Sequence, residues 1–204
     1  GESVVTAPSH CMTCGRKLRW YDMVPVFSWL VLGGKCRNCK TRISVQYPII
    51  EGVNGILYVV IFVVNGLVWN SLIYCLMVSA LLVLSVIDWR TYEIPFGINV
   101  FLFVLGIAMA VLDRGNLAEH LIGMVCVSGL LEILYLISGG GAIGGGDIKL
   151  MFACGLILGW KLILLAFVLG CIIGSVGPYL SAGILLAALW GNRWISWYLS
   201  LIFN

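Results

Sequence analysis

The chain has 204 residues, of which 61% are hydrophobic and only 10% are charged, and its mean hydropathy is +1.07. This composition excludes an ordinary soluble globular domain, in which about a quarter of the residues are charged. The net charge of +3 does not indicate a nucleic-acid partner, because no aromatic ladder accompanies the basic residues. Attraction to a membrane surface explains the charge more simply, so we expect the lipid bilayer as a partner and no nucleic acid.

The first 46 residues form a long polar segment. Between Cys11 and Arg42 it holds Asp22 as its acidic residue and the following basic residues: Arg16, Lys17, Arg19, Lys35, Arg37, Lys40 and Arg42. Loops rich in Lys and Arg resist translocation and stay on the cytoplasmic side. The sequence therefore predicts a cytoplasmic domain over 1–46 and a transmembrane domain over 47–204. No signal peptide is visible and the chain opens on Gly1, so we expect a processed or truncated chain.

The polar segment carries two C-x2-C pairs, Cys11 with Cys14 and Cys36 with Cys39, which are separated by 21 residues. Paired thiolates at this spacing can close a tetrahedral zinc site, and the gap is just longer than is customary in zinc ribbons. The alternative is two disulfides, but cytosolic thiols are normally kept reduced. The pattern favours Zn²⁺ held by four protein ligands, which is a structural site because no coordination position stays open.

The remaining chain is apolar in stretches close to the roughly 20 residues that cross a bilayer as a helix. We predict an all-α polytopic membrane protein with about seven transmembrane helices and a small zinc-ribbon-like domain at its N-terminus. The predicted helices are 47–69, 71–87, 96–112, 120–137, 148–159, 161–176 and 178–191, the last three divided by glycines and Pro178.

Two aspartates lie at predicted helix ends. Asp88 closes the helix 71–87, and Asp147 follows Gly144, Gly145 and Gly146 and begins the helix 148–159. Both are predicted at the same depth on the cytoplasmic side. Two carboxylates that share a site retain one proton between them and can act as acid and base on a water molecule, as in an aspartic protease. Paired acids at helix ends also occur in transporters.

Four motifs in this order resemble the type IV prepilin peptidases, which are membrane aspartic proteases of the GxGD type. They are the cysteine loop SHCMTCGRKLRWYDMVPVFSWLVLGGKCRNCKTRISVQYPIIEG, then DWRTYEIP, GGGDIKL and GPYL. The resemblance implies that Asp88 and Asp147 are the catalytic pair and that the four cysteines hold zinc. It also implies a multi-pass protein of the bacterial inner membrane that cuts type IV prepilins or type II secretion pseudopilins after a glycine, on the cytoplasmic side.

Many members of this family then methylate the new amino terminus with S-adenosylmethionine. Gly144, Gly145 and Gly146 are expected to form a flexible wall of the substrate site. Glu51, Glu93 and Lys149 are candidates for contacts with the leader or the methyl donor, and the alternative for each is an interfacial position facing headgroups.

Two alternatives remain open at this point. A peptidase-only relative would cut without methylating, and a transporter would use its paired acids to move ions. Members of the family usually carry a membrane helix before the cysteine box, and this sequence has none there.

Overall fold

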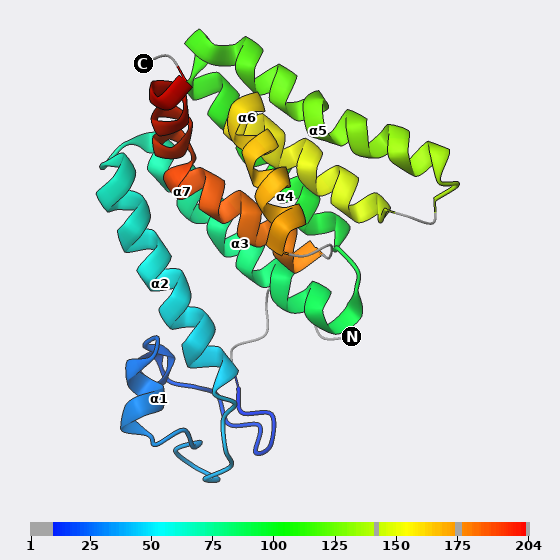
Figure 1. The fold of residues 1–204 in the computed structure, drawn as a ribbon. Coiled ribbons are helices and arrows are strands. Elements are labelled where there is room, and N and C mark those ends of the chain that lie inside the picture. Colours follow the sequence, from blue (N-terminus) through cyan, green and yellow to red (C-terminus); the bar gives the residue numbers. More distant parts are fainter. Residues whose placement is uncertain (1–9, 141–142, 174–176, 203–204) are drawn as a thin grey trace. The chain divides into compact units, whose positions relative to one another are not determined.

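The computed structural model describes residues 10–140, 143–173 and 177–202 and divides the chain into two compact units, Gly1–Ile56 and Leu57–Asn204 (Figure 1). The described part is nearly all helical, with isolated β-bridges and no strand. Its helices are η1 (Trp20–Met23), α1 (Phe27–Val31), α2 (Gln46–Asn65), α3 (Trp69–Thr91), α4 (Phe96–Leu112), η2 (Arg114–Asn116), α5 (Leu117–Ile137), α6 (Gly145–Ile173) and α7 (Gly177–Ile202).

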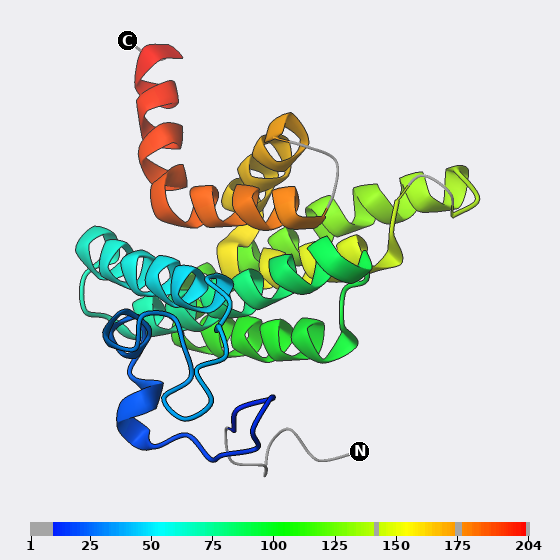
Figure 2. The ribbon, with the colours of Figure 1, turned by 90° about the horizontal axis from the view of Figure 1, so that it is seen from below.

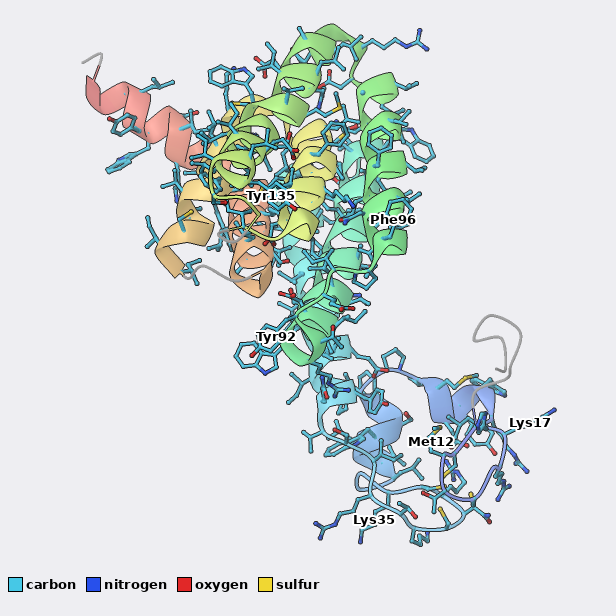
Figure 3. All side chains as sticks on the ribbon, turned by 90° about the vertical axis from the view of Figure 1, so that its right-hand side faces the viewer. Met12, Lys17, Lys35, Tyr92, Phe96 and Tyr135 are labelled. Atoms are coloured by element: carbon cyan, nitrogen blue, oxygen red, sulfur yellow. The ribbon has the colours of Figure 1, made fainter. Side chains whose placement is uncertain are left out.

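The N-terminal unit is built mainly from turns, and its short helices η1 and α1 lie between the two cysteine pairs. The Trp29 side chain organises this segment: its indole N–H donates to the carbonyl of Ile43 at 3.3 Å. Its ring also lies against Gly34, whose φ of 68° suits glycine, and a Cβ there would come within 2.7 Å of the ring. Met12, at 92% exposure, and the Lys17 and Lys35 side chains cover the surface of the unit (Figure 3).

In the second unit α6 is the central helix. It packs against α4, α5 and α7, while α3 packs against α4 and α7 (Figures 1 and 2). One apolar core joins these helices; its fully buried side chains include Met77, Leu81, Leu102, Met151, Ile157 and Ile184. Small residues bring the backbones close together, as is usual between helices in lipid. A Cβ at Gly123 of α5 would lie 2.5 Å from the carbonyl oxygen of Gly155 of α6.

The expected count of seven transmembrane helices is too high for the described residues. Four segments are long and apolar enough to cross a membrane: α2, α3, 114–137 and α6; α4 is apolar but has only 17 residues. The helices predicted over 148–159 and 161–176 are the two halves of α6, except that residues 174–176 lie outside the described part. The helix predicted over 178–191 is α7, which extends to Ile202.

The expected division of α6 is present as a break at Gly159, whose φ of 76° and ψ of 171° are not helical. Glycine adopts this conformation without the steric cost of a Cβ. The break removes the usual partner of the Leu156 carbonyl, which instead accepts a hydrogen bond from His120 Nδ1 at 2.9 Å. Beside it, Lys161 forms a 2.8 Å ion pair with Glu119. The break in α6 and the start of α5 therefore form one end of this unit.

Candidate functional site

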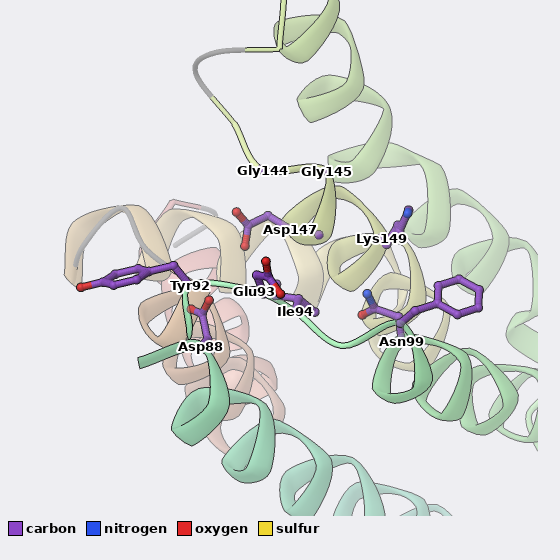
Figure 4. A pocket seen from close by; sticks show the side chains of 11 residues that line it. Asp88, Tyr92, Glu93, Ile94, Asn99, Gly144, Gly145, Asp147 and Lys149 are labelled. Atoms are coloured by element: carbon purple, nitrogen blue, oxygen red, sulfur yellow. The ribbon is translucent and has the colours of Figure 1, made fainter. Parts of the chain in front are cut away.

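A pocket of about 450 Å³ lies at the other end of the second unit, where α3 ends and α4 and α6 begin (Figure 4). Its lining residues are Asp88, Tyr92, Glu93, Ile94, Phe96, Asn99, Gly144, Gly145, Gly146, Asp147 and Lys149. The two aspartate motifs, some 60 residues apart in the sequence, thus meet in one cavity. Polar groups that converge in a concave site are the usual mark of a binding or active site.

Asp88 and Asp147 face each other across this pocket (Figure 4). Asp88 lies in the last turn of α3 and is only 5% exposed, and Asp147 is half-buried in the first turn of α6. Oδ2 of Asp88 and Oδ1 of Asp147 are buried without a hydrogen-bond partner among the described residues. A buried carboxylate oxygen is costly without a partner, so this arrangement suits groups that act on a ligand.

The short connection from α3 to α4 brings the two motifs together. Tyr92 takes the left-handed conformation, with φ of 53°, and its N–H bonds to the Asp88 carbonyl at 2.8 Å, which ends α3. Pro95 then caps the start of α4. Between them, Ile94 packs against Gly146 so closely that a Cβ on the glycine would lie 3.0 Å from the Cβ of Ile94. The absence of a side chain at Gly146 therefore sets the spacing of the pocket walls.

Gly146→Ala is expected to lower kcat/KM by up to about tenfold, because the new Cβ, 3.0 Å from the Cβ of Ile94, requires a shift of a few tenths of an ångström beside Asp147, and a displacement of about 1 Å at a reacting centre costs about a hundredfold. The added methyl would push the start of α6 away from the connection that follows Asp88. The matched control is Gly97→Ala in the first turn of α4, where a Cβ would meet nothing within 4 Å. Peptide cleavage assays on both variants measure the difference, and equal activities would contradict this account of the close contact.

The three glycines of the predicted substrate loop take different places. Gly145 and Gly146 belong to the first turn of α6, so the helix begins before Asp147 and not after it. Gly144 precedes the helix, and its carbonyl accepts the Asp147 N–H at 3.1 Å. A Cβ at Gly144 would lie 3.1 Å from Oδ2 of Asp147, so this position also leaves room for the carboxylate.

Two of the other three predicted contact residues line the pocket, and the third belongs to the N-terminal unit. Glu93 and Lys149 line the pocket, and the Lys149 ammonium lies 5.9 Å from the centre of the Phe96 ring. Glu51 lies in the N-terminal unit, where its Oε2 accepts the N–H of Val26 at 3.0 Å. Val26 has φ of 60°, which is a strained conformation for a β-branched residue. Glu51 therefore holds a strained turn in place.

Asn99 is the pocket residue that the sequence reasoning missed most clearly. It lies in the first turn of α4, is 6% exposed, and its Oδ1 is buried without a partner among the described residues. A signal was present in the sequence, because a side-chain amide four residues after Pro95 interrupts an otherwise apolar helix. Tyr92, Ile94 and Phe96 also line the pocket and were not predicted.

The four predicted metal ligands converge in the N-terminal unit. The Sγ atoms of Cys11, Cys14, Cys36 and Cys39 all lie within 4.8 Å of one another, and the thiols are free. Sγ of Cys11 and Sγ of Cys39 are 3.7 Å apart. Zn–S bonds of about 2.3 Å in a tetrahedron place the sulfurs about 3.8 Å apart, whereas a disulfide needs about 2.05 Å. The donor set therefore fits a tetrahedral metal ion.

The two cysteine turns have the same backbone geometry. In each, the first cysteine N–H bonds to the carbonyl five residues later: Cys11 to Arg16 and Cys36 to Thr41, at 2.9 and 2.8 Å. The residue four positions after each first cysteine, Gly15 or Lys40, has a positive φ. Hydrogen bonds with Thr41 lower the pKa of the Cys39 thiol to about 6. Two matching turns thus present their thiols to one centre.

Comparison with known proteins identifies the family. Residues 1–65 match the bacterial peptidase A24 N-terminal domain, and residues 75–179, which include both aspartates, match the type IV leader peptidase family. The chain belongs to the type IV leader peptidase family. The chain is 29% identical to the prepilin leader peptidase/N-methyltransferase of Aeromonas salmonicida, a match that covers 95% of this chain and 75% of the relative.

Two further relatives carry the same name. The Bacillus subtilis protein is 29% identical, over 98% of this chain and 88% of the relative. The Burkholderia pseudomallei protein is 32% identical, over 86% of this chain and 64% of the relative. No solved structure matches this leader peptidase significantly. The family-level interpretation of the sequence is confirmed.

Proposed function

We propose that this chain is an aspartic endopeptidase that removes the leader peptide of type IV prepilins and pseudopilins after a glycine. The observation that carries the proposal is the pair of buried carboxylates, Asp88 and Asp147, that face each other in one pocket at the ends of α3 and α6. The relatives are prepilin leader peptidase/N-methyltransferases by name, which supports prepilins as the substrate class.

The chemistry follows from two carboxyl groups that share one proton. The ionised carboxylate takes a proton from water, and the oxygen attacks the carbonyl carbon while the other carboxyl gives its proton to the carbonyl oxygen. The C–N bond of this tetrahedral intermediate then breaks as the amine nitrogen takes a proton from the first carboxyl. A proton from the remaining hydroxyl returns to the second carboxylate, which restores the pair with one water consumed.

The helix ends suggest which carboxyl does which step. Asp147 lies in the first turn of α6, where the helix dipole stabilises an anion, and Asp88 lies in the last turn of α3, where it does not. We therefore assign Asp147 as the base and Asp88 as the proton carrier in the resting enzyme. A neutron structure with the single proton on Asp147 would contradict this assignment.

The glycines at 144–146 suit an extended substrate. A peptide must be extended to be cut, and its N–H and C=O groups then need partners that packed helices do not offer. Gly144 and Gly145 leave the backbone at the pocket wall uncovered, because each is exposed. A peptide chain can approach such a backbone closely.

For the N-terminal unit we propose a structural zinc ion held by Cys11, Cys14, Cys36 and Cys39, whose sulfur spacing fits a tetrahedral site. When bound, zinc would join the two cysteine turns and stabilise the unit without chemical turnover. The basic residues of this unit support a cytoplasmic location for it, and the pocket would open on the same side of the bacterial inner membrane.

Cys36→Ser is expected to abolish zinc binding and to expose residues 10–56 to proteolysis, because the folding of small metal domains depends on the metal. Cys171→Ser, at an exposed cysteine in the second half of α6, is the matched control and should retain zinc. Elemental analysis of the reduced protein measures the zinc content of each variant, and limited proteolysis measures the exposure of residues 10–56. Full zinc content in the Cys36 variant would contradict the proposal that these four cysteines hold the zinc ion.

We also propose methylation of the new amino terminus with S-adenosylmethionine, on the basis of the relatives' names. Glu93 and Lys149 fit this methyl donor, because their charges complement its cationic groups and its carboxylate. When bound, it would supply the methyl group. The same two side chains also suit contacts with a leader, and Glu51, whose Oε2 accepts the Val26 N–H, stays a candidate for such a contact.

The test uses purified full-length chain in lipid with a prepilin, with and without S-adenosylmethionine, and mass spectrometry of the product. The expected result is cleavage after the leader glycine in both cases and a gain of one methyl group only with the donor. Cleavage without a methyl group in the presence of the donor would identify a peptidase-only enzyme. No cleavage, combined with ion flux through proteoliposomes, would favour a transporter.

A further inference from the structure

The pocket contains a polar group that the two-carboxylate chemistry does not use. Asn99 Oδ1 is one of three buried oxygens without a hydrogen-bond partner in the described part of the chain, and the other two belong to Asp88 and Asp147. All three residues line the same pocket. Figure 4 shows the side-chain amide of Asn99 pointing from α4 into this pocket.

A buried amide oxygen without a hydrogen-bond partner is unfavourable, and the neighbouring positions of α4 are apolar. A structural amide usually satisfies its polar atoms on nearby protein groups; Asn65 Nδ2, for example, donates to the carbonyl of Ile61, one turn earlier in α2, at 3.2 Å. Asn99 makes no such bond through Oδ1 in the described residues. Its free acceptor therefore suits a hydrogen-bond donor on a ligand.

The chemistry of the amide indicates which ligand. A carboxamide offers an acceptor oxygen and donor N–H groups side by side, as a peptide group on a neighbouring β-strand does. An extended peptide that enters this pocket loses water from its own N–H and C=O groups and needs such partners. The Gly144 and Gly145 backbone lines the same pocket, so a second hydrogen-bonding wall is present.

We propose that Asn99 forms a subsite for the main chain of the substrate beside the cleaved bond. Its Oδ1 accepts one substrate N–H, and its Nδ2 donates to a substrate carbonyl. Asn99 thus binds and orients the extended peptide without taking part in proton transfer. This inference rests on the proposed peptidase function of the pocket.

The test is a cycle that changes both partners of the hydrogen bond. The substrates are prepilin peptides in which one backbone amide at a time, on either side of the cleaved bond, is replaced by an ester, which lacks the N–H. The enzymes are the full-length wild type and Asn99→Leu, which is similar in size, with Asn99→Ala as a second variant if Asn99→Leu does not fold. Thermal unfolding of each variant reports any structural effect.

We expect one ester position to lower wild-type kcat/KM by about tenfold, as for a hydrogen bond worth somewhat over 1 kcal/mol. The Asn99 variant should cleave this ester peptide and the unmodified peptide equally well. It should cleave the unmodified peptide with a kcat/KM about tenfold lower than that of the wild type, mainly through a higher KM. Ester penalties that are identical in both enzymes would overturn the subsite. Wild type that cleaves no prepilin would instead overturn the proposed function, and the subsite with it.

Discussion

Asp88→Asn and Asp147→Asn are each expected to reduce prepilin cleavage by at least about 10⁴-fold, the usual scale for removing one member of a group that acts as a unit. Asparagine preserves the shape of the side chain but cannot pass a proton to or from the reacting atoms. Because the two carboxyls act on one water and one carbonyl group, the double variant should be no slower than either single variant. Single-turnover cleavage in lipid measures these rates.

The matched control is Asp113→Asn, at the opposite end of the unit, where Oδ2 of Asp113 lies 3.4 Å from Nε2 of His120. Because an asparagine amide can either donate to or accept from Nε2, the contact with His120 is retained and cleavage should remain close to wild type. A second measurement supplies a prepilin that has already been cut: methyl transfer should survive in both active-site variants, because it needs no activated water. Unchanged cleavage in both Asp88→Asn and Asp147→Asn would exclude the aspartic mechanism.

The meeting of the two aspartates was predictable because it depends only on helix ends. Asp88, before Pro95, and Asp147, after the glycine run, each mark the end of a helical segment. Both ends are predicted at one membrane depth, and this prediction does not depend on how the helices pack. The structure brings both into one pocket. The cysteine cluster was predictable for a similar reason, since metal ligands in short turns carry their geometry in their spacing.

Asn99 and Glu51 were not predictable, because their roles depend on what lies opposite them. Asn99 reads in the sequence as a polar interruption of a helix, and only the fold shows that it is buried beside two carboxylates. Glu51 stays a candidate ligand contact, and only the fold shows that its Oε2 also accepts the Val26 N–H. Tertiary contacts of this kind have no periodicity that a sequence could reveal.

Glycines inside α6 show the same limit. The predicted bounds 148–159 and 161–176 place the break beside Gly159, but the sequence gives no reason why Gly155, four residues earlier, stays helical. In the structure Gly159 breaks α6, whereas Gly155 stays helical and packs against the backbone of Gly123. A glycine within a helix is less favourable than alanine by about 1 kcal/mol at either position. The different conformations of Gly155 and Gly159 therefore depend on the contacts that each makes with the neighbouring helix α5.

Gly123→Ala is expected to destabilise the protein by about 3 kcal/mol, near the upper end for overpacking. Its new Cβ would lie 2.5 Å from the Gly155 carbonyl oxygen and 2.7 Å from the Trp160 nitrogen, and both are backbone atoms that cannot turn aside. The helices α5 and α6 must separate to accept it. Reversible unfolding in mixed micelles measures the free energy of unfolding.

Gly129→Ala is the matched control, since it makes the same change on the same helix where a Cβ would meet only Val125 Cγ1 at 3.5 Å. It should be neutral or stabilising by up to about 1 kcal/mol, because alanine favours the helix. The crossing also affects the distant site, because α6 runs from Gly155 back to Asp147. Gly123→Ala should therefore reduce cleavage as well as stability, and equal stabilities of the two variants would show that the crossing does not hold the helices together.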